Sequence, residues 1–144
     1  MPKPNTGAYP SQIKLDVWDT AGQDEYQAMN RNFFAGAHCV IVVFAVDSPS
    51  SFQSIETHMY NIDSYCSKDV IKILVGNKCD LESGRHINYD DMMDKGTDLN
   101  IRCFETSCLD AKRSTINELF NEISLMLCQA NVARSTAGSF KIKA

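Results

Sequence analysis

Two runs of apolar residues place the strongest constraint on how this chain can fold. Residues 39–46 and 70–75 are almost wholly apolar and rich in β-branched side chains. Strands of this composition are buried on both faces, which is typical of a parallel sheet covered by helices. Between them, apolar side chains from Phe52 to Ile62 recur at helical spacing, after cap candidates at 48–50. The pattern predicts an α/β fold with helices on both faces of the sheet.

The remaining segments continue this alternation of strands and helices. Residues 13–18 alternate apolar with polar, as expected for a strand with one covered face. The further expected elements are a short helix at 29–34 ended by Gly36, a helix at 88–99, a strand at 101–106 and a helix at 116–127. The predicted organisation is an irregular leader at 1–12, a partial domain at 13–129 and a flexible tail at 130–144, whose residues are mostly small and polar.

Composition narrows the function class. A chain of 144 residues fits one domain, and its formal net charge of −4 at pH 7 disfavours non-specific binding to nucleic acid. The six cysteines show no C-x-x-C motif and no spacing suited to zinc, so we expect free thiols in a reducing cytosol. No apolar run reaches the roughly 18 residues of a membrane span. The sequence therefore predicts a cytoplasmic protein.

A polar tetrapeptide follows the second apolar run. Asn77-Lys78-Cys79-Asp80 comes directly after the predicted strand, where ligands bind in open α/β sheets. A carboxylate there can accept hydrogen bonds from the ring N–H and exocyclic amine of guanine, an aliphatic stem can cover the base, and an amide can hold the ring edge. The alternative interpretation is a polar turn that merely ends a strand. The position after a buried strand favours a guanine site.

Three motifs in this order resemble the Ras superfamily of small GTPases. They are Trp18-Asp19-Thr20-Ala21-Gly22-Gln23, Asn77-Lys78-Cys79-Asp80 and Glu105-Thr106-Ser107. The segment Asn32-Phe33-Phe34-Ala35-Gly36-Ala37 is similar to one common in Rab proteins, whereas Asp24-Glu25-Tyr26-Gln27-Ala28-Met29 leans towards Ras. The chain is therefore most similar to the Rab-like branch.

The resemblance implies a doubly wound, mostly parallel sheet of the P-loop NTPase type, and a molecular switch that binds GTP and GDP with Mg²⁺ and hydrolyses GTP. In this comparison Asp19 would hold Mg²⁺ through a water, the backbone N–H of Gly22 would meet the γ-phosphate, and Gln23 would orient the attacking water. Effector and regulator proteins would contact the region Asp19–Phe34. The Rab branch further implies signalling in vesicle trafficking.

The resemblance also assigns the guanine half of the site. Asn77, Lys78 and Asp80 would clamp the base, Ser107 would steady the clamp, and the backbone N–H of Cys108 would reach the guanine oxygen. Where the family has a lysine after this pair, the chain has Leu109. We expect this exchange to weaken base recognition because the charged stem that helps to cover the base is lost.

The phosphate half lacks a motif that the resemblance would require. No G-x-x-x-x-G-K-[ST] sequence occurs in the 144 residues. We therefore expect the first strand, phosphate loop, first helix and second strand of the family fold to be missing, a unit of roughly 30 residues or more. In the family, that first strand lies between the strands corresponding to 13–18 and 39–46. These two neighbours would have to close up, borrow a strand or stay partly disordered.

Two hypotheses follow from this pattern. The first is a partial gene model or splice product of a Rab-like GTPase, with impaired nucleotide binding. The alternative is a pseudo-GTPase module that binds a protein partner through its switch surface without hydrolysis. In either case Cys128 fits no C-a-a-X pattern, so no lipid anchor is evident, although the family includes peripheral membrane proteins.

Overall fold

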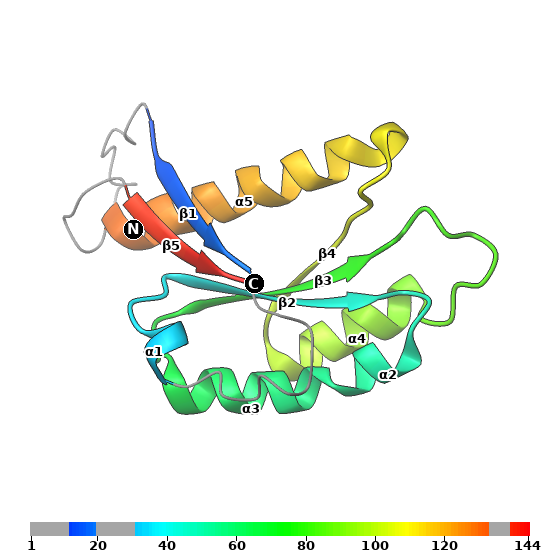
Figure 1. Cartoon of the computed structure of the whole chain (residues 1–144), viewed down its shortest axis with the longest axis horizontal. Coiled ribbons are helices and arrows are strands. Elements are labelled where there is room, and N and C mark those ends of the chain that lie inside the picture. The colour runs from blue at the N-terminus through cyan, green and yellow to red at the C-terminus, as the bar shows by residue number, and fades with distance from the viewer. Residues whose placement is uncertain (1–11, 20–30, 133–138) are drawn as a thin grey trace, which may run out of the picture.

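The computed structural model describes residues 12–19, 31–132 and 139–144 of the chain. In these residues, five strands form one sheet in the order β1-β5-β2-β3-β4, and every neighbouring pair is parallel (Figure 1). The strands are β1 (Lys14–Trp18), β2 (Cys39–Ala45), β3 (Ile71–Asn77), β4 (Arg102–Glu105) and β5 (Ser139–Lys143). The helices are α1 (Arg31–Phe34), α2 (Pro49–Gln53), α3 (Ile55–Tyr65), α4 (Tyr89–Leu99) and α5 (Arg113–Val132), with a 3₁₀ turn, η2 (Asp110–Lys112), before α5. The predicted α/β class is confirmed.

Helices cover both faces of the sheet. Figure 1 shows α5 alone on one face and α2, α3 and α4 on the other. Each buried strand therefore needs apolar side chains in both directions, as predicted from the two apolar runs. On β3, Ile73 packs toward α5 and its neighbour Leu74 packs toward the opposite face, and both are fully buried. Burying a side chain of this size stabilises the fold by about 1.5–3 kcal/mol.

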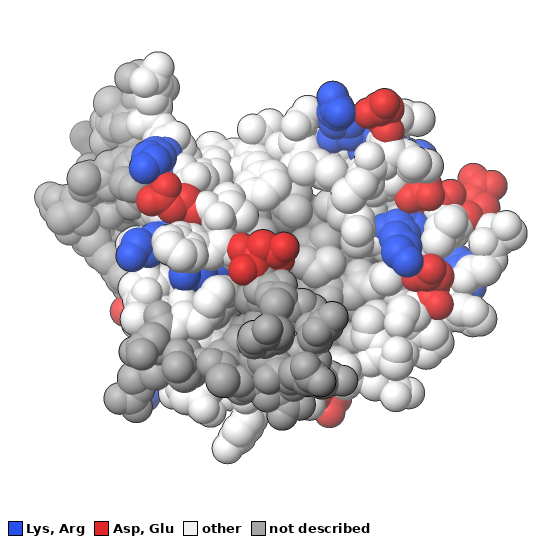
Figure 2. Space-filling view, in the orientation of Figure 1, with Lys and Arg blue, Asp and Glu red and all other residues white. Residues whose placement is uncertain are grey.

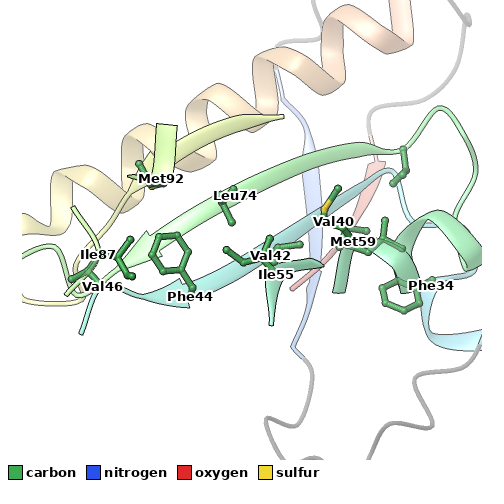
Figure 3. Close-up of a cluster of buried hydrophobic side chains, with 12 residues drawn as sticks. Phe34, Val40, Val42, Phe44, Val46, Ile55, Met59, Leu74, Ile87 and Met92 are labelled. Carbon is green, nitrogen blue, oxygen red and sulfur yellow. The ribbon is translucent and has the colours of Figure 1, made fainter. Parts of the chain in front are cut away.

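The two apolar cores follow directly from this alternation. The core beneath α5 contains Cys39, Ile41, Ile73, Val75, Leu119, Ile123, Leu127, Phe140 and Ile142. The opposite core contains Phe34, Val40, Val42, Phe44, Val46, Ile55, Met59, Ile62, Val70, Leu74, Ile87 and Met92, most of which Figure 3 labels. A sheet position and the next one along a strand thus contribute to different cores.

Helix boundaries carry the expected capping groups. Ser48 caps α2, its hydroxyl accepting a hydrogen bond from the backbone N–H of Ser51 at 3.3 Å, and Pro49 opens the helix. Asn88 forms a reciprocal capping box with Asp91 at the start of α4. Asn100 ends α4 in the left-handed region, where asparagine is tolerated better than most residues.

The prediction of a flexible tail at 130–144 is wrong for most of the residues that the structure describes there. α5 continues to Val132, and Ser139–Lys143 form β5. The small and polar composition of the segment conceals a short alternation, in which Phe140 and Ile142 point into the core beneath α5. Strand alternation needs only these few residues to bury one face.

β5 lies between β1 and β2, in the place that the family comparison gives to the first strand of the family fold (Figure 1). It pairs with β1 over five positions, from Lys14↔Ser139 to Trp18↔Lys143, and with β2 over two. The expected choice was between closing up, borrowing a strand and partial disorder. The strand is borrowed, and it comes from the end of the same chain.

Among the described residues, no helix is both long enough and apolar enough to cross a membrane.

Candidate functional site

The candidate site lies along the edge of the sheet where the parallel strands end. Asp19 follows β1, Asp47 lies two residues beyond the end of β2, Asn77 is the last residue of β3, and Thr106 follows β4. Parallel strands bring their carboxyl ends to one edge, so residues distant in sequence converge there. Figure 2 shows acidic and basic side chains interspersed on the face of the molecule that is seen in the orientation of Figure 1.

Backbone and side-chain hydrogen bonds tie the loops after β3 and β4 together. Thr106 Oγ1 donates to Asn77 Oδ1 at 3.1 Å. The backbone N–H of Cys79 donates to the carbonyl of Thr106 at 3.0 Å, and the N–H of Thr106 donates to the carbonyl of Gly76 at 2.9 Å. The side chain of Asn77, at the edge where the site lies, therefore also helps to hold the loop after β4 in place.

Ser107 fixes the carboxylate of Asp80. Its hydroxyl donates to Asp80 Oδ1 at 2.5 Å and accepts from the backbone N–H of Leu109 at 3.1 Å. The backbone N–H of Ser107 donates to Thr115 Oγ1 at 3.1 Å, and the residue is fully buried. A hydrogen bond to an ionised group is shorter and stronger than a neutral one, so it orients the carboxylate firmly. No described residue donates a hydrogen bond to Asp80 Oδ2.

Lys78 lies between the ends of β2 and β3. Its backbone is in the left-handed region, with φ of 64°, and its carbonyl accepts a bond from the N–H of Leu81 at 3.0 Å. Its ammonium reaches Asp47 Oδ2 at 3.0 Å, while about half of its side chain is exposed. Sequence reasoning missed Asp47. The available signal was its position just after the first apolar run, at the same edge as Asn77.

Cys108 and Leu109 form the outer rim of the site. Both are exposed, and 57% of the Leu109 surface is accessible. A large apolar side chain thus faces solvent where the resemblance would put a charged stem. The site residues that sequence analysis predicted for the guanine half, Asn77, Lys78, Asp80, Ser107 and Cys108, all come from these two connected loops.

A partly buried ion pair links the segment after β3 to the last residue of β4. The guanidinium of Arg85 pairs with the carboxylate of Glu105, and Arg85 Nε also donates to the carbonyl of Ile87 at 2.7 Å. Burial, followed by the negative charge of Glu105, raises the pKa of the Cys79 thiol above its usual value. Cys79 therefore stays a neutral thiol near pH 7. The sequence analysis did not single out Arg85 or Glu105 as a pair.

The phosphate half is described only in part. Gly22 and Gln23 lie outside the described residues, and Asp19 is exposed at the end of β1. Beside it, the backbone N–H of Ala144 donates to the carbonyl of Trp18 at 2.9 Å. The end of β5 thus lies next to Asp19, in the position where the family would have the chain leading to its phosphate loop.

A cavity of about 300 Å³ adjoins Asp19. It lies between β2, α1, α3 and the end of β5, is lined mostly by apolar side chains, and does not include the residues of the guanine half. Lys143 also lines it, with Nζ 4.1 Å from the centre of the Trp18 ring and 4.5 Å from that of Phe33. Burial, followed by the nearby charge of Lys141, lowers the pKa of Lys143.

Comparison with known proteins decides the family. Residues 5–129 match the model of the Ras family. The chain belongs to the Ras family. Its relatives include the Ras-related protein Rab-1C of Dictyostelium discoideum, 40% identical over 114 residues that make up 78% of this chain and 55% of that protein. The GTP-binding protein YPT1 of Saccharomyces cerevisiae is 32% identical over 128 residues, 86% of this chain and 61% of that protein.

These matches make the chain a Rab-like member of the Ras family, which confirms the resemblance read from its motifs. A third relative, the Ras-related protein RABD2a of Arabidopsis thaliana, is 35% identical over 127 residues, 88% of this chain and 61% of that protein. The chain spans about half to three fifths of the length of these curated relatives.

Ras-family proteins in general bind guanine nucleotide together with Mg²⁺. The described residues contain no group of three or more His, Cys, Asp or Glu side chains that could hold a metal ion. Asp19 is a single carboxylate, and the cavity beside it also holds the ammonium of Lys143. A cation next to the site disfavours a second cation. Mg²⁺ at a nucleotide site usually takes one or two protein carboxylates together with phosphate oxygens and water, and Asp19 would supply one such carboxylate at the end of β1.

Proposed function

We propose that this chain carries the guanine-recognition half of a Rab-like GTPase switch and binds GDP and GTP through its two connected loops. One observation carries the proposal. The 2.5 Å hydrogen bond from Ser107 to Asp80 holds a carboxylate at the sheet edge, beside Asn77 and Lys78. Such an arrangement is pre-organised, so little ordering of the side chains remains to be done when a ligand arrives.

The residue chemistry favours guanine over adenine. Guanine presents a ring N–H and an exocyclic amine on one edge, and a fixed carboxylate such as that of Asp80 accepts from both. Adenine presents an unprotonated ring nitrogen there and no amine, so the same carboxylate would lose both bonds. A site that leaves charged groups unpaired in this way discriminates strongly against the wrong ligand.

GTP hydrolysis enters this proposal only as a general activity of the family. The resemblance assigns the orienting of the attacking water to Gln23, and phosphoryl transfer depends on positioning and electrostatic stabilisation of the phosphates. The phosphate-loop motif, whose backbone N–H groups would bind the phosphates, does not occur in the 144 residues. We therefore propose nucleotide binding for this chain and derive no hydrolytic step from its described residues.

Calorimetry on the full chain tests the proposal. GDP should release or absorb measurable heat on binding, whereas ADP at the same concentration should not. Asp80→Ala should weaken GDP binding by at least about tenfold, because a hydrogen bond to a charged group contributes about 1.5–3 kcal/mol. Equal binding of GDP and ADP, or no binding of either, would overturn it.

A second candidate function is a pseudo-GTPase interaction module that binds a protein partner through the region 19–34. The position of β5 favours this candidate, since β5 of the same chain pairs with both β1 and β2 and joins them in one sheet. A purified chain that unfolds cooperatively and binds no guanine nucleotide would support this candidate. A chain that aggregates alone would count against it.

A further inference from the structure

The carboxylate of Asp47 has two unlike oxygens. Oδ2 pairs with the ammonium of Lys78 at 3.0 Å. Oδ1 is buried and accepts no hydrogen bond from any residue that the structure describes. Burying an oxygen of a carboxylate without a hydrogen bond is unfavourable, so a turn that served only to end β2 would be more stable with a smaller or neutral residue here. The attraction to Lys78 is the interaction that offsets this cost.

The backbone around Asp47 is held on both sides. The N–H of Val46 donates to the carbonyl of Asn77 at 3.1 Å, and the carbonyl of Val46 accepts from the N–H groups of His86 and Ile87 at 2.8 and 2.9 Å. The N–H of Ser48 donates to the carbonyl of Ala45 at 3.0 Å. The carboxylate is therefore presented from a fixed point, at the end of β2 and beside the end of β3.

The backbone of Lys78 is fixed as well. A lysine at φ of 64° is in a sparsely populated region, and such a conformation persists only where the surroundings hold it. Here the N–H of Leu81 bonds to its carbonyl, and the next residue, Cys79, is tied to Thr106. With the backbone and the ammonium both held, the four-carbon stem must run between the ends of β2 and β3.

We propose that Asp47 is a positioning residue for the guanine site, holding the ammonium of Lys78 so that the lysine stem is in place to cover the base. This inference rests on the proposed function. A free lysine side chain loses considerable rotamer freedom when it is ordered by a ligand. Because the ion pair with Asp47 already restricts the lysine side chain, less conformational entropy is lost when the ligand binds. Affinity therefore rises without any contact between Asp47 and the nucleotide.

The proposal has a specific consequence for ligand dependence. Because the lysine stem covers the base and not the phosphates, loss of Asp47 should weaken GMP, GDP and GTP by the same factor. A residue that acted on the phosphates would give a factor that changes with their number. The series of three nucleotides therefore separates a role at the base from a role at the phosphates.

A double-mutant cycle on the full chain tests the proposal by calorimetry. Asp47→Asn removes the charge at constant size, and Lys78→Met keeps the stem and removes the ammonium. Asp47→Asn alone should lower GDP affinity by about 3- to 10-fold, the cost of ordering one long side chain. In the Lys78→Met background the same change should have no further effect. Asp47→Thr serves as a second variant if the asparagine variant does not fold.

Asp63→Asn is the matched control, since Asp63 pairs with Lys72 near the amino end of β3, the end opposite the site. It should leave GDP affinity unchanged. If Asp47→Asn binds GDP as tightly as the unmodified chain, or loses the same factor with and without the Lys78 ammonium, the positioning role is wrong while the guanine site stands. If the unmodified chain binds no guanine nucleotide, the proposed function fails and this inference fails with it.

Discussion

The hydroxyl of Ser107 lies 2.5 Å from Oδ1 of Asp80, across a sequence separation of 27 residues. The bond joins the loop after β4 to the loop after β3, and it uses the only hydroxyl that a serine has. The same oxygen accepts the N–H of Leu109 at 3.1 Å. Ser107 thus sets both the orientation of the carboxylate and the path of the rim loop.

Replacing Ser107 by alanine should weaken GDP binding by about tenfold. The loss follows from removing a hydrogen bond to a charged group, worth about 1.5–3 kcal/mol, and is measured by calorimetry. Ser64→Ala is the control, because among the described residues the Ser64 hydroxyl bonds only to the carbonyl of Tyr60 on α3. Unchanged GDP affinity in Ser107→Ala would show that the carboxylate of Asp80 needs no such support.

Replacing Asp80 by asparagine should move the preference from guanine to xanthine. The Ser107 hydroxyl donates to the oxygen at this position, so it would select the amide orientation whose NH₂ group faces the base. An NH₂ donor matches the second ring carbonyl of xanthine and opposes the amine of guanine. Competition between XDP and GDP measures the change. An Asp80→Asn chain that still prefers GDP would place the base elsewhere.

The sequence predicted the elements whose periodicity is long and unmixed. β2 and β3 are apolar at nearly every position, and their ends were placed within one or two residues. The guanine loops were also predictable, because polar residues after buried strands must emerge at one edge of a parallel sheet. The resemblance implied only that Ser107 would steady the clamp, and in the structure its hydroxyl donates to Asp80 Oδ1.

Two features needed the three-dimensional arrangement. β5 presents only two inward apolar side chains, Phe140 and Ile142, in a polar context, so its periodicity is too short to identify. β5 also pairs with β1 and β2, two strands that are far from it in sequence, so local sequence does not indicate its partners. The pair of Asp47 and Lys78 was hidden for a related reason, since 31 residues separate the two and neither position is unusual alone.

The buried ammonium of Lys143 should make stability depend on alkaline pH. Burial lowers the pKa of Lys143 in the folded chain below its usual value of 10.5. Between the folded pKa and the unfolded one, the unfolded chain therefore binds more protons, and the free energy of unfolding rises with pH. Urea unfolding of the unmodified chain and of Lys143→Met, from pH 7 to pH 10.5, should show the difference shifting in favour of the unmodified chain as pH rises. A constant difference would mean that the ammonium is well solvated.

The borrowed strand makes a prediction about folding that does not depend on nucleotide. Ile142 is fully buried beneath α5 and lies in β5 opposite Val17 on one side and Cys39 on the other. Ile142→Ala should lower the free energy of unfolding by about 2–5 kcal/mol, the usual cost of a cavity at a buried isoleucine. Lys141→Ala, at the next and exposed position of the same strand, should change it by less than about 0.5 kcal/mol. Urea denaturation followed by circular dichroism measures both. If the two variants unfolded at the same urea concentration, β5 would contribute nothing to the sheet, and the space between β1 and β2 would have to be closed in another way.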